Sequence, residues 1–335
     1  MSSQALVAPS HHFHLPVAQM RSVFQPDEVQ RKLARLQNGD HAREHDNLRA
    51  TYLRMLERGP QRFQVKPAGV PDMADLYDVL PNFHAVLDDV RRHVALAQDS
   101  RDGMEVTPLL LLGPPGIGKT HFAKKLADLL GTGMNLVPMS SMTAGWLLSG
   151  SSSQWKGSRP GKVFEALVEG EYANPVIVVD EIDKASADAQ YDPLGALYSL
   201  LEHDTAQNFT DEYAEVAIDA SQVIWVTTAN DERAIPEPIL NRMNVFEIAS
   251  PTPAQARHIA QLLYHSIRAD HDWGRLLVEE PLADVLDQLA TIAPREMRRA
   301  LMTGFGNARL AGREMVQVSD LPKADASKTR MGFVH

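Results

Sequence analysis

The sequence has 335 residues, of which 44% are hydrophobic and 23% are charged, a composition typical of a globular protein with room for two domains. It contains no cysteine, which excludes disulfides, thiolate metal sites and cysteine nucleophiles. The formal net charge of -10 argues against a globally basic nucleic-acid binder. No apolar run is long enough for a membrane span and no signal peptide opens the chain, so we expect a cytoplasmic protein.

Two helical patterns are predicted near the start of the chain. Apolar residues recur at spacings of three and four over residues 27–37 and 42–57, with a turn signal at residues 38–40. Residues 59–81 contain four prolines and two glycines and are predicted to be a linker or extended arm. We therefore assign residues 1–82 to an N-terminal helical hairpin and linker. Its apolar stripe fits packing on the rest of the chain or on a partner equally well.

Short apolar runs then alternate with helical patterns. The runs lie at residues 109–112, 135–139, 176–179, 223–226 and 245–248, and they predict a parallel sheet covered by helices on both faces. Helical patterns alone follow, through residues 252–267, 282–289 and 296–310. We expect an α/β domain over residues 83–250, a small all-helical domain over residues 251–318 and a tail over residues 319–335.

A phosphate-binding loop is predicted between the first of these strands and the helix after it. The motif fits G-x-x-x-x-G-K-[ST] and consists of Gly113, Pro114, Pro115, Gly116, Ile117, Gly118, Lys119 and Thr120. The glycines let the backbone turn its N–H groups toward an anion, and the following helix adds partial positive charge. Lys119 is expected to reach the β- and γ-phosphates, and the Thr120 hydroxyl to bind Mg²⁺.

Two carboxylates follow directly after the apolar run at residues 176–179. Asp180 and Glu181 would lie at the carboxyl end of a buried parallel strand, where ligands bind in open sheets. We expect Asp180 to hold Mg²⁺ and Glu181 to polarise the attacking water, which predicts a P-loop NTPase with ATP and Mg²⁺ as cofactors.

The chain from about residue 80 to residue 310 resembles the AAA+ ATPases and, among them, the ATPase module of Lon proteases. The phosphate loop and the acidic strand end carry the general resemblance, and residues 174–176, 192–197, 204–211, 227–230 and 235–243 carry the Lon-like one. The resemblance implies that Asn230 is the sensor that positions the attacking water. It implies that Arg242 reaches into a neighbouring subunit's site. It also implies that Arg295 contacts the γ-phosphate from a helical lid, although Arg298 and Arg299 lie close in sequence.

Residues 154–161 resemble the pore loop of Lon. Trp155 takes the place of the aromatic residue that faces the channel, and Gly157 follows at the expected position. Lys156 stands where the family usually has an aliphatic residue. The serine-rich stretch before Trp155 is typical of an exposed loop.

Together these features predict an Mg²⁺-dependent ATPase that assembles as a ring, expected to be a hexamer, and remodels or unfolds a protein partner without cutting it. Because only a short polar tail follows the helical domain, we expect no peptidase domain in this chain. The alternative hypothesis is a nucleotide-dependent switch or loader acting on nucleic-acid complexes. Basic side chains of the N-terminal hairpin would then contact phosphates, namely Arg31, Lys32, Arg35, Arg43, Arg49, Arg54 and Arg58.

Overall fold

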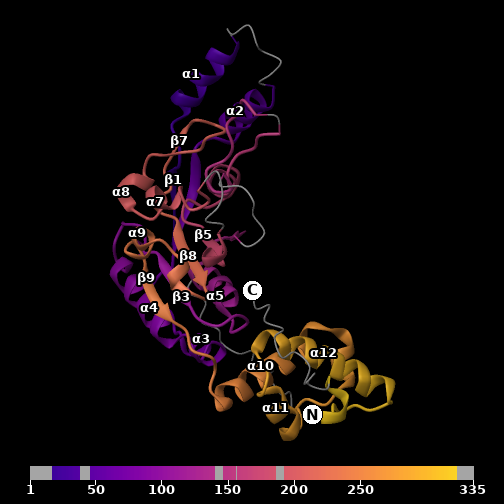
Figure 1. The fold of residues 1–335 in the computed structure, drawn as a ribbon. Helices are drawn as coiled ribbons and strands as arrows, with labels where there is room; N and C mark the ends of the chain where they lie inside the picture. Colours follow the sequence, from indigo (N-terminus) through magenta and orange to yellow (C-terminus); the bar gives the residue numbers. More distant parts are fainter. Residues whose placement is uncertain (1–16, 38–45, 140–145, 156, 186–191, 323–335) are drawn as a thin grey trace, which may run out of the picture. The chain divides into compact units, whose positions relative to one another are not determined.

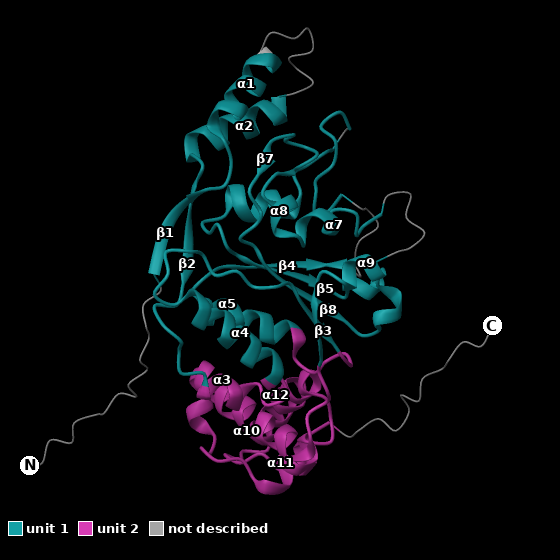
Figure 2. Cartoon of the chain, turned by 90° about the vertical axis from the view of Figure 1, so that its left-hand side faces the viewer, with its two compact units in different colours: residues 1–73, 85–112, 120–247 teal, residues 74–84, 113–119, 248–335 magenta. Residues whose placement is uncertain are grey.

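The structure is a computed structural model that describes residues 17–37, 46–139, 146–155, 157–185 and 192–322 (Figure 1). The chain divides into two compact units, which Figure 2 shows in different colours. The first contains Met1–Met73, Ala85–Leu112 and Thr120–Glu247, and the second contains Ala74–His84, Gly113–Lys119 and Ile248–His335. Each unit has a hydrophobic core of its own. The domain boundaries expected from the sequence stay predictions.

The first unit is built on a sheet of five strands in the order β4-β5-β8-β3-β9. These strands are β3 (Leu109–Leu112), β4 (Met134–Pro138), β5 (Val176–Asp180), β8 (Ile224–Ala229) and β9 (Asn244–Glu247). All of the pairings between them are parallel. The expected parallel α/β sheet is therefore confirmed.

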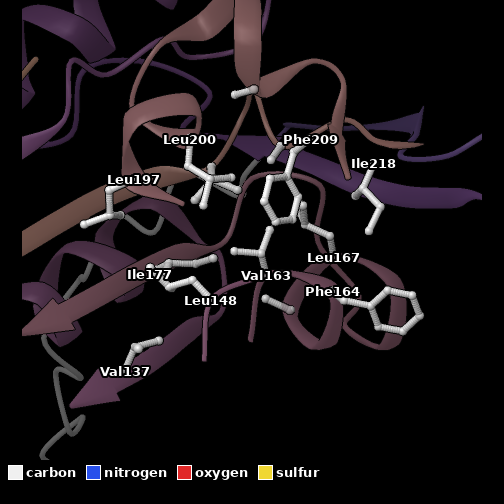
Figure 3. Packing of buried hydrophobic residues seen from close by; sticks show 14 of the residues in the cluster. Val137, Leu148, Val163, Phe164, Leu167, Ile177, Leu197, Leu200, Phe209 and Ile218 are labelled. Carbon is white, nitrogen blue, oxygen red and sulfur yellow. The ribbon is translucent and has the colours of Figure 1, made fainter. Parts of the chain in front are cut away.

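Helices lie on both faces of this sheet (Figure 2). On one side are α4 (His84–Ala97) and α5 (Lys119–Leu130). The other side carries α7 (Leu197–Leu200) and α8 (His203–Ala206). Side chains of α6 (Lys162–Phe164) and of the π-helical turn Glu165–Glu169 belong to the same core cluster as α7. Ile177 of β5 packs with Leu200 and Phe209 of this second layer (Figure 3). Because alternate residues of a strand face opposite layers, β5 is apolar from Val176 to Val179 without a break.

The connection from β5 to β8 contains more structure than one crossover helix. After the 3₁₀ turn Ile182–Lys184 come α7, α8 and a small antiparallel pair, β6 (Phe209–Thr210) and β7 (Ala217–Ile218). The 3₁₀ turn Glu232–Ala234 and α9 (Glu237–Leu240) follow β8. Strands of two residues carry no periodicity, so β6 and β7 were not predicted.

The N-terminal part contributes side chains to the core of the first unit. A helix is present at each predicted place, α1 (Pro26–Gln37) and α2 (Asp46–Arg58), and the two lie side by side (Figure 1). Val29, Leu48, Tyr52 and Met55 are buried in the same cluster as the sheet. Of the two packing alternatives, the structure shows packing on the chain's own core.

Residues 59–81, which we expected to be a linker or extended arm, contain β2 (Gln61–Lys66) and α3 (Ala74–Val79) instead. β2 pairs with β1 (Val17–Ser22) in an antiparallel ribbon. The alternation in β2 is inverted, because Arg62 is 3% exposed while Phe63 is 48% exposed. The Arg62 guanidinium is satisfied by backbone carbonyls, those of Gly59, Gln61, Leu167 and Val168.

The second unit is mainly helical, as expected for the C-terminal region. It contains α3, α10 (Pro253–Asp270), α11 (Ala283–Leu289) and α12 (Pro294–Leu310), with 3₁₀ turns at Asp272–Leu276 and Val318–Asp320. The N-terminal cap of α10 is Thr252, which forms a reciprocal capping box with Gln255. Tyr264, Met297 and Phe305 lie in its core. Gln255 also donates a hydrogen bond to the Pro81 carbonyl, which joins α10 to the segment after α3.

Candidate active site

The predicted phosphate loop, residues 113–120, connects β3 to α5. Gly116 and Gly118 have φ angles of 80° and 106°, which residues with a Cβ rarely adopt. Gly113 is required for space, because a Cβ there would lie 2.2 Å from the Ile248 carbonyl oxygen. Pro114, Pro115 and the buried Ile117 complete the turn. The loop therefore has the strand, the helix and the glycine conformations that a phosphate cradle needs.

The Lys119 side chain stays close to its own loop. It is 8% exposed, and its Nζ donates hydrogen bonds to the carbonyl oxygens of Gly113 and Pro114, the latter at 3.0 Å. The ammonium group is thus fixed beside the loop backbone, where a phosphate would be neutralised.

The start of α12 also contacts this loop within the second unit. The Arg295 backbone N–H donates to the Gly116 carbonyl oxygen at 3.2 Å, and a Cβ on Gly116 would lie 3.5 Å from Arg295 Cβ. Arg299 lies beside Glu296 on the same helix, with its Nη2 3.6 Å from Glu296 Oε1. Of the three candidates, Arg295 is the one whose backbone the loop contacts; its role at the γ-phosphate stays a prediction.

Asp180 is surrounded by hydroxyl groups at the carboxyl end of β5. The Thr228 hydroxyl donates to Asp180 Oδ1 at 2.6 Å, and the Thr120 hydroxyl lies 3.2 Å from the same oxygen. Thr228 belongs to β8, which pairs with β5 in the sheet. The last residue of the phosphate loop and residues of two adjacent strands therefore meet at one carboxylate.

Glu181 has the left-handed backbone conformation, with φ 55° and ψ 52°. For a residue with a side chain this costs on the order of 1–2 kcal/mol, so surrounding contacts must hold it. Its N–H donates to the Thr228 hydroxyl at 2.9 Å, and its carbonyl accepts from Lys184 N at 2.9 Å. Backbone strain held in this way is typical of functional sites.

The two predicted Mg²⁺ ligands, Thr120 and Asp180, fit that ion. Two neighbouring ligands of octahedral Mg²⁺, each about 2.1 Å from the metal, lie about 3 Å apart. The observed separation of Thr120 Oγ1 and Asp180 Oδ1 is 3.2 Å. A hydroxyl and one carboxylate, with phosphate and water oxygens, is a donor set that Mg²⁺ takes in nucleotide sites.

Asn230 directly follows β8, whose neighbour in the sheet is β5. Because parallel strands end at the same edge, Asn230 and Asp180 lie at the same edge of the sheet. Its role in positioning water stays a prediction.

Arg242 lies after α9, and its side chain contacts Tyr198 of α7 and Glu202, which lies between α7 and α8. Its Nε lies 2.6 Å from Glu202 Oε1, and its guanidinium carbon lies 5.9 Å from the centre of the Tyr198 ring. An action in a neighbouring subunit stays a prediction. The structure adds Glu202 as the group that orients Arg242.

The loop that carries Trp155 is closed by a backbone hydrogen bond from Ser151 N to the Arg159 carbonyl oxygen, and Trp155 itself is exposed. Trp155 is 44% exposed, and its ring meets the Trp146 ring edge-on with centroids 5.6 Å apart. Gly157, with φ 84°, makes the turn after it, and Lys156 lies outside the described residues. The exposure agrees with a surface loop rather than a core tryptophan.

Three residues beside these sites were not predicted to have a role, namely Glu202, Thr228 and Asp211. Asp211 is fully buried and accepts N–H groups from Gly161, Tyr213 and Ala214 at 2.8 to 3.0 Å. Burial raises its pKa from 3.8 to about 6 against the opposing effect of these hydrogen bonds. Only Thr228 carried a signal, since it is one of two adjacent threonines, with Thr227, in a buried strand.

Comparison with known proteins agrees with this geometry. Residues 109–250 match the family model "ATPase family associated with various cellular activities (AAA)". The match agrees with the parallel sheet and the phosphate loop that these residues form.

The curated relatives include several Lon proteases. The chain is 31% identical to the Lon protease of Methanosarcina barkeri over 325 residues, which cover 92% of this chain and 40% of that protein. It is 35% identical to the Lon protease of Halothermothrix orenii over 192 residues, 56% of this chain and 24% of that protein. The chain thus spans well under half the length of these relatives.

Among solved structures, a mutant of Thermotoga maritima RuvB matches with a TM-score of 0.46 and 15% identity, covering 76% of this chain and 71% of that chain. Within the described part of the chain, no helix is both long and apolar enough to cross a membrane.

Proposed function

We propose that this protein is an Mg²⁺-dependent ATPase that works as a ring of subunits, expected to be six, and remodels a protein partner. The observation that carries the proposal is the cluster formed by Thr120, Asp180 and Thr228, with Glu181 beside it, in an AAA domain. The resemblance to the ATPase part of Lon proteases supports a protein as the substrate.

The residues divide the work of hydrolysis among them. The loop glycines and Lys119 bind the phosphates, and Thr120 and Asp180 would hold Mg²⁺, which neutralises phosphate charge when bound. Glu181, placed one residue beyond Asp180, would orient the attacking water and accept its proton. Asn230 at the same sheet edge would hold the other side of that water.

Replacing Glu181 by Gln tests the reaction itself. ATP turnover should be lost while ATP binding remains, because the amide keeps the shape and loses the proton-accepting charge. Glu247, an exposed carboxylate that ends β9 at the same edge of the sheet, provides the matched control Glu247→Gln. Equal turnover in the wild type and Glu181→Gln would remove Glu181 from the mechanism.

The ring is tested by mixing two inactive variants. Arg242→Ala retains Glu181 but would deprive its neighbour of an arginine, and Glu181→Gln retains Arg242. If Arg242 acts on the neighbouring subunit, a mixture regains ATP turnover that neither variant has alone. If Arg242 acts within its own subunit, the mixture stays inactive and the ring mechanism fails.

The protein substrate is tested at Trp155. Trp155→Ala should keep ATP turnover and lose ATP-driven unfolding of a labelled model protein, whereas Trp155→Phe should keep both. If Trp155→Ala still unfolds the model protein, the loop does not contact the substrate.

The described residues do not favour the alternative role on nucleic acids. Three of the basic side chains proposed to contact phosphates bind this chain instead. Lys32 lies 3.5 Å from Glu215, Arg54 lies 3.7 Å from Glu169, and Arg58 donates to the Gly170 carbonyl.

A further inference from the structure

A cavity of about 500 Å³ opens beside Trp155 in the first unit. Its walls come from the Trp155 loop, from α7 and α8 with the residues before them, and from the β6 segment; the lining includes Trp146, Trp155, Asp192, Phe209 and Glu212. This volume lies within the range of pockets that bind small ligands.

The charged side chains that line the cavity, in the part of the chain that the structure describes, are all acidic. Among the described residues that line it, the ionisable ones are Asp192 and Glu212, both exposed carboxylates. The remaining polar lining consists of hydroxyls and one amide, contributed by Ser149, Ser199, Thr205, Asn208 and Thr210. Glu212 Oε1 accepts from the Ser149 hydroxyl at 2.9 Å, which orients the carboxylate. Such a lining favours a cation.

The aromatic part of the lining favours the same charge. The Trp146 and Trp155 rings meet edge-on, and both belong to the wall. Indole faces attract ammonium and guanidinium groups, and they also pack against the methylene stems of lysine and arginine.

The walls are fixed by the core below them. Phe209 is 5% exposed and points into the cluster that contains Leu148 and Val163, the buried residues on either side of the Trp155 loop (Figure 3). Above them, Glu212 N donates to the Ser149 carbonyl at 2.6 Å and Gly161 N donates to Asp211. The cavity is therefore built by the fold rather than by surface side chains alone.

We propose that this cavity binds the lysine or arginine side chain of a polypeptide that the Trp155 loop contacts, so that the protein prefers basic segments of its substrate. The proposal rests on the proposed function, since it assigns a substrate class to the same loop.

The test uses labelled, unstructured peptides of equal length that carry Lys, Ser or Glu at alternate positions. The full chain should bind the Lys peptide at least about tenfold more tightly than the Ser peptide, and the Glu peptide least. Asp192→Asn with Glu212→Gln should abolish this preference and leave binding of the Ser peptide unchanged. Asp204→Asn, an exposed carboxylate of α8 outside the lining, is the matched control and should keep the preference.

A second readout locates the contact. A carbodiimide joins carboxylates to amines in contact, so the Lys peptide should cross-link to Asp192 or Glu212. Equal binding of the Lys and Ser peptides overturns the proposal, and so does a preference that survives the double variant. Cross-links confined to other carboxylates also overturn it. Because binding is measured without turnover, failure of ATP hydrolysis and failure of this proposal are distinguishable.

Discussion

Two pairs of neighbouring carboxylates in the first unit, Asp180–Glu181 and Asp211–Glu212, are held in different ways. Asp180 receives side-chain hydroxyls from Thr120 and Thr228, whereas Asp211 receives backbone N–H groups. Hydroxyls rotate, so the first carboxylate can exchange them for a ligand. Backbone N–H groups move only with the chain, so the second carboxylate fixes a loop. Similar side chains thus differ in what they can do: the first fits the metal ligand of the proposed function, and the second anchors a loop.

The largest expected effect is the pH dependence of the free energy of unfolding that Asp211, the loop anchor, should cause. Burial raises the Asp211 pKa from 3.8 to about 6, so the folded protein holds the proton more tightly than the unfolded chain. The stability contributed by this group is complete below about pH 4 and is lost as the pH rises through about 6. Over that window the wild type should lose about 3 kcal/mol relative to Asp211→Asn, measured by denaturant unfolding at each pH.

Glu212, whose nearby charge also raises the Asp211 pKa, should be replaced by Gln in a parallel series. That variant should keep most of the pH dependence, because burial is the larger cause. Parallel stability curves for the wild type and Asp211→Asn would show that Asp211 does not titrate in this window.

The next effect tests the ligand pair. Thr228→Val keeps the shape of a fully buried side chain but removes the donor to Asp180 and the acceptor of the Glu181 N–H. Loss of a group that orients a metal ligand typically costs about 10–100-fold in activity or metal affinity. ATP turnover should fall by that factor and the half-saturating Mg²⁺ concentration should rise, while Thr228→Ser restores both. An unchanged Mg²⁺ dependence would mean that Asp180 needs no orienting hydroxyl.

A smaller effect, on peptide binding, should show that the Asp211–Glu212 pair acts separately from the Asp180–Glu181 pair. Asp211 Oδ2 accepts a hydrogen bond from Gly161 N–H, and Oδ1 accepts from the N–H groups of Tyr213 and Ala214. In Asp211→Asn an amide NH₂, which cannot accept a hydrogen bond, takes the place of one of these oxygens. One anchor of the Trp155 loop is therefore lost. Binding of the Lys peptide should weaken by about fivefold to tenfold, the effect of losing about one ordinary hydrogen bond, with ATP turnover nearly unchanged. Equal losses of binding and turnover would show that the two regions are not separate.

The candidate ligand Asp180 could be proposed from the sequence, whereas the anchor Asp211 could not. The phosphate loop and Asp180 follow local rules, a glycine spacing and an apolar strand that ends in acids, and local rules can be seen in a sequence. Asp211 depends on Gly161, fifty residues away in the chain, and only folding brings the two together.

β2 was missed for a related reason. Its buried Arg62 is satisfied by backbone carbonyls of other segments, so the polar residue points inward and hydropathy misleads. Burial and the charge of Arg58 also lower the Arg62 pKa.

The smallest effect asks whether the N-terminal part supports the anchor. The Tyr52 hydroxyl of α2 donates to the Ala214 carbonyl oxygen at 2.8 Å. The N–H of the same residue, Ala214, donates to Asp211. Burial raises the Tyr52 pKa well above its usual range, so the phenol remains a donor at neutral pH. Tyr52→Phe leaves the carbonyl without this partner and should lower the free energy of unfolding by about 1 kcal/mol, with a small loss of Lys-peptide binding.

Tyr172→Phe, a half-buried tyrosine whose hydroxyl has no hydrogen bond to the described residues, is the control and should change neither. If Tyr52→Phe is less stable but binds the Lys peptide as the wild type does, α2 contributes only to packing. Asp211 would then hold the Trp155 loop without the Tyr52 hydrogen bond.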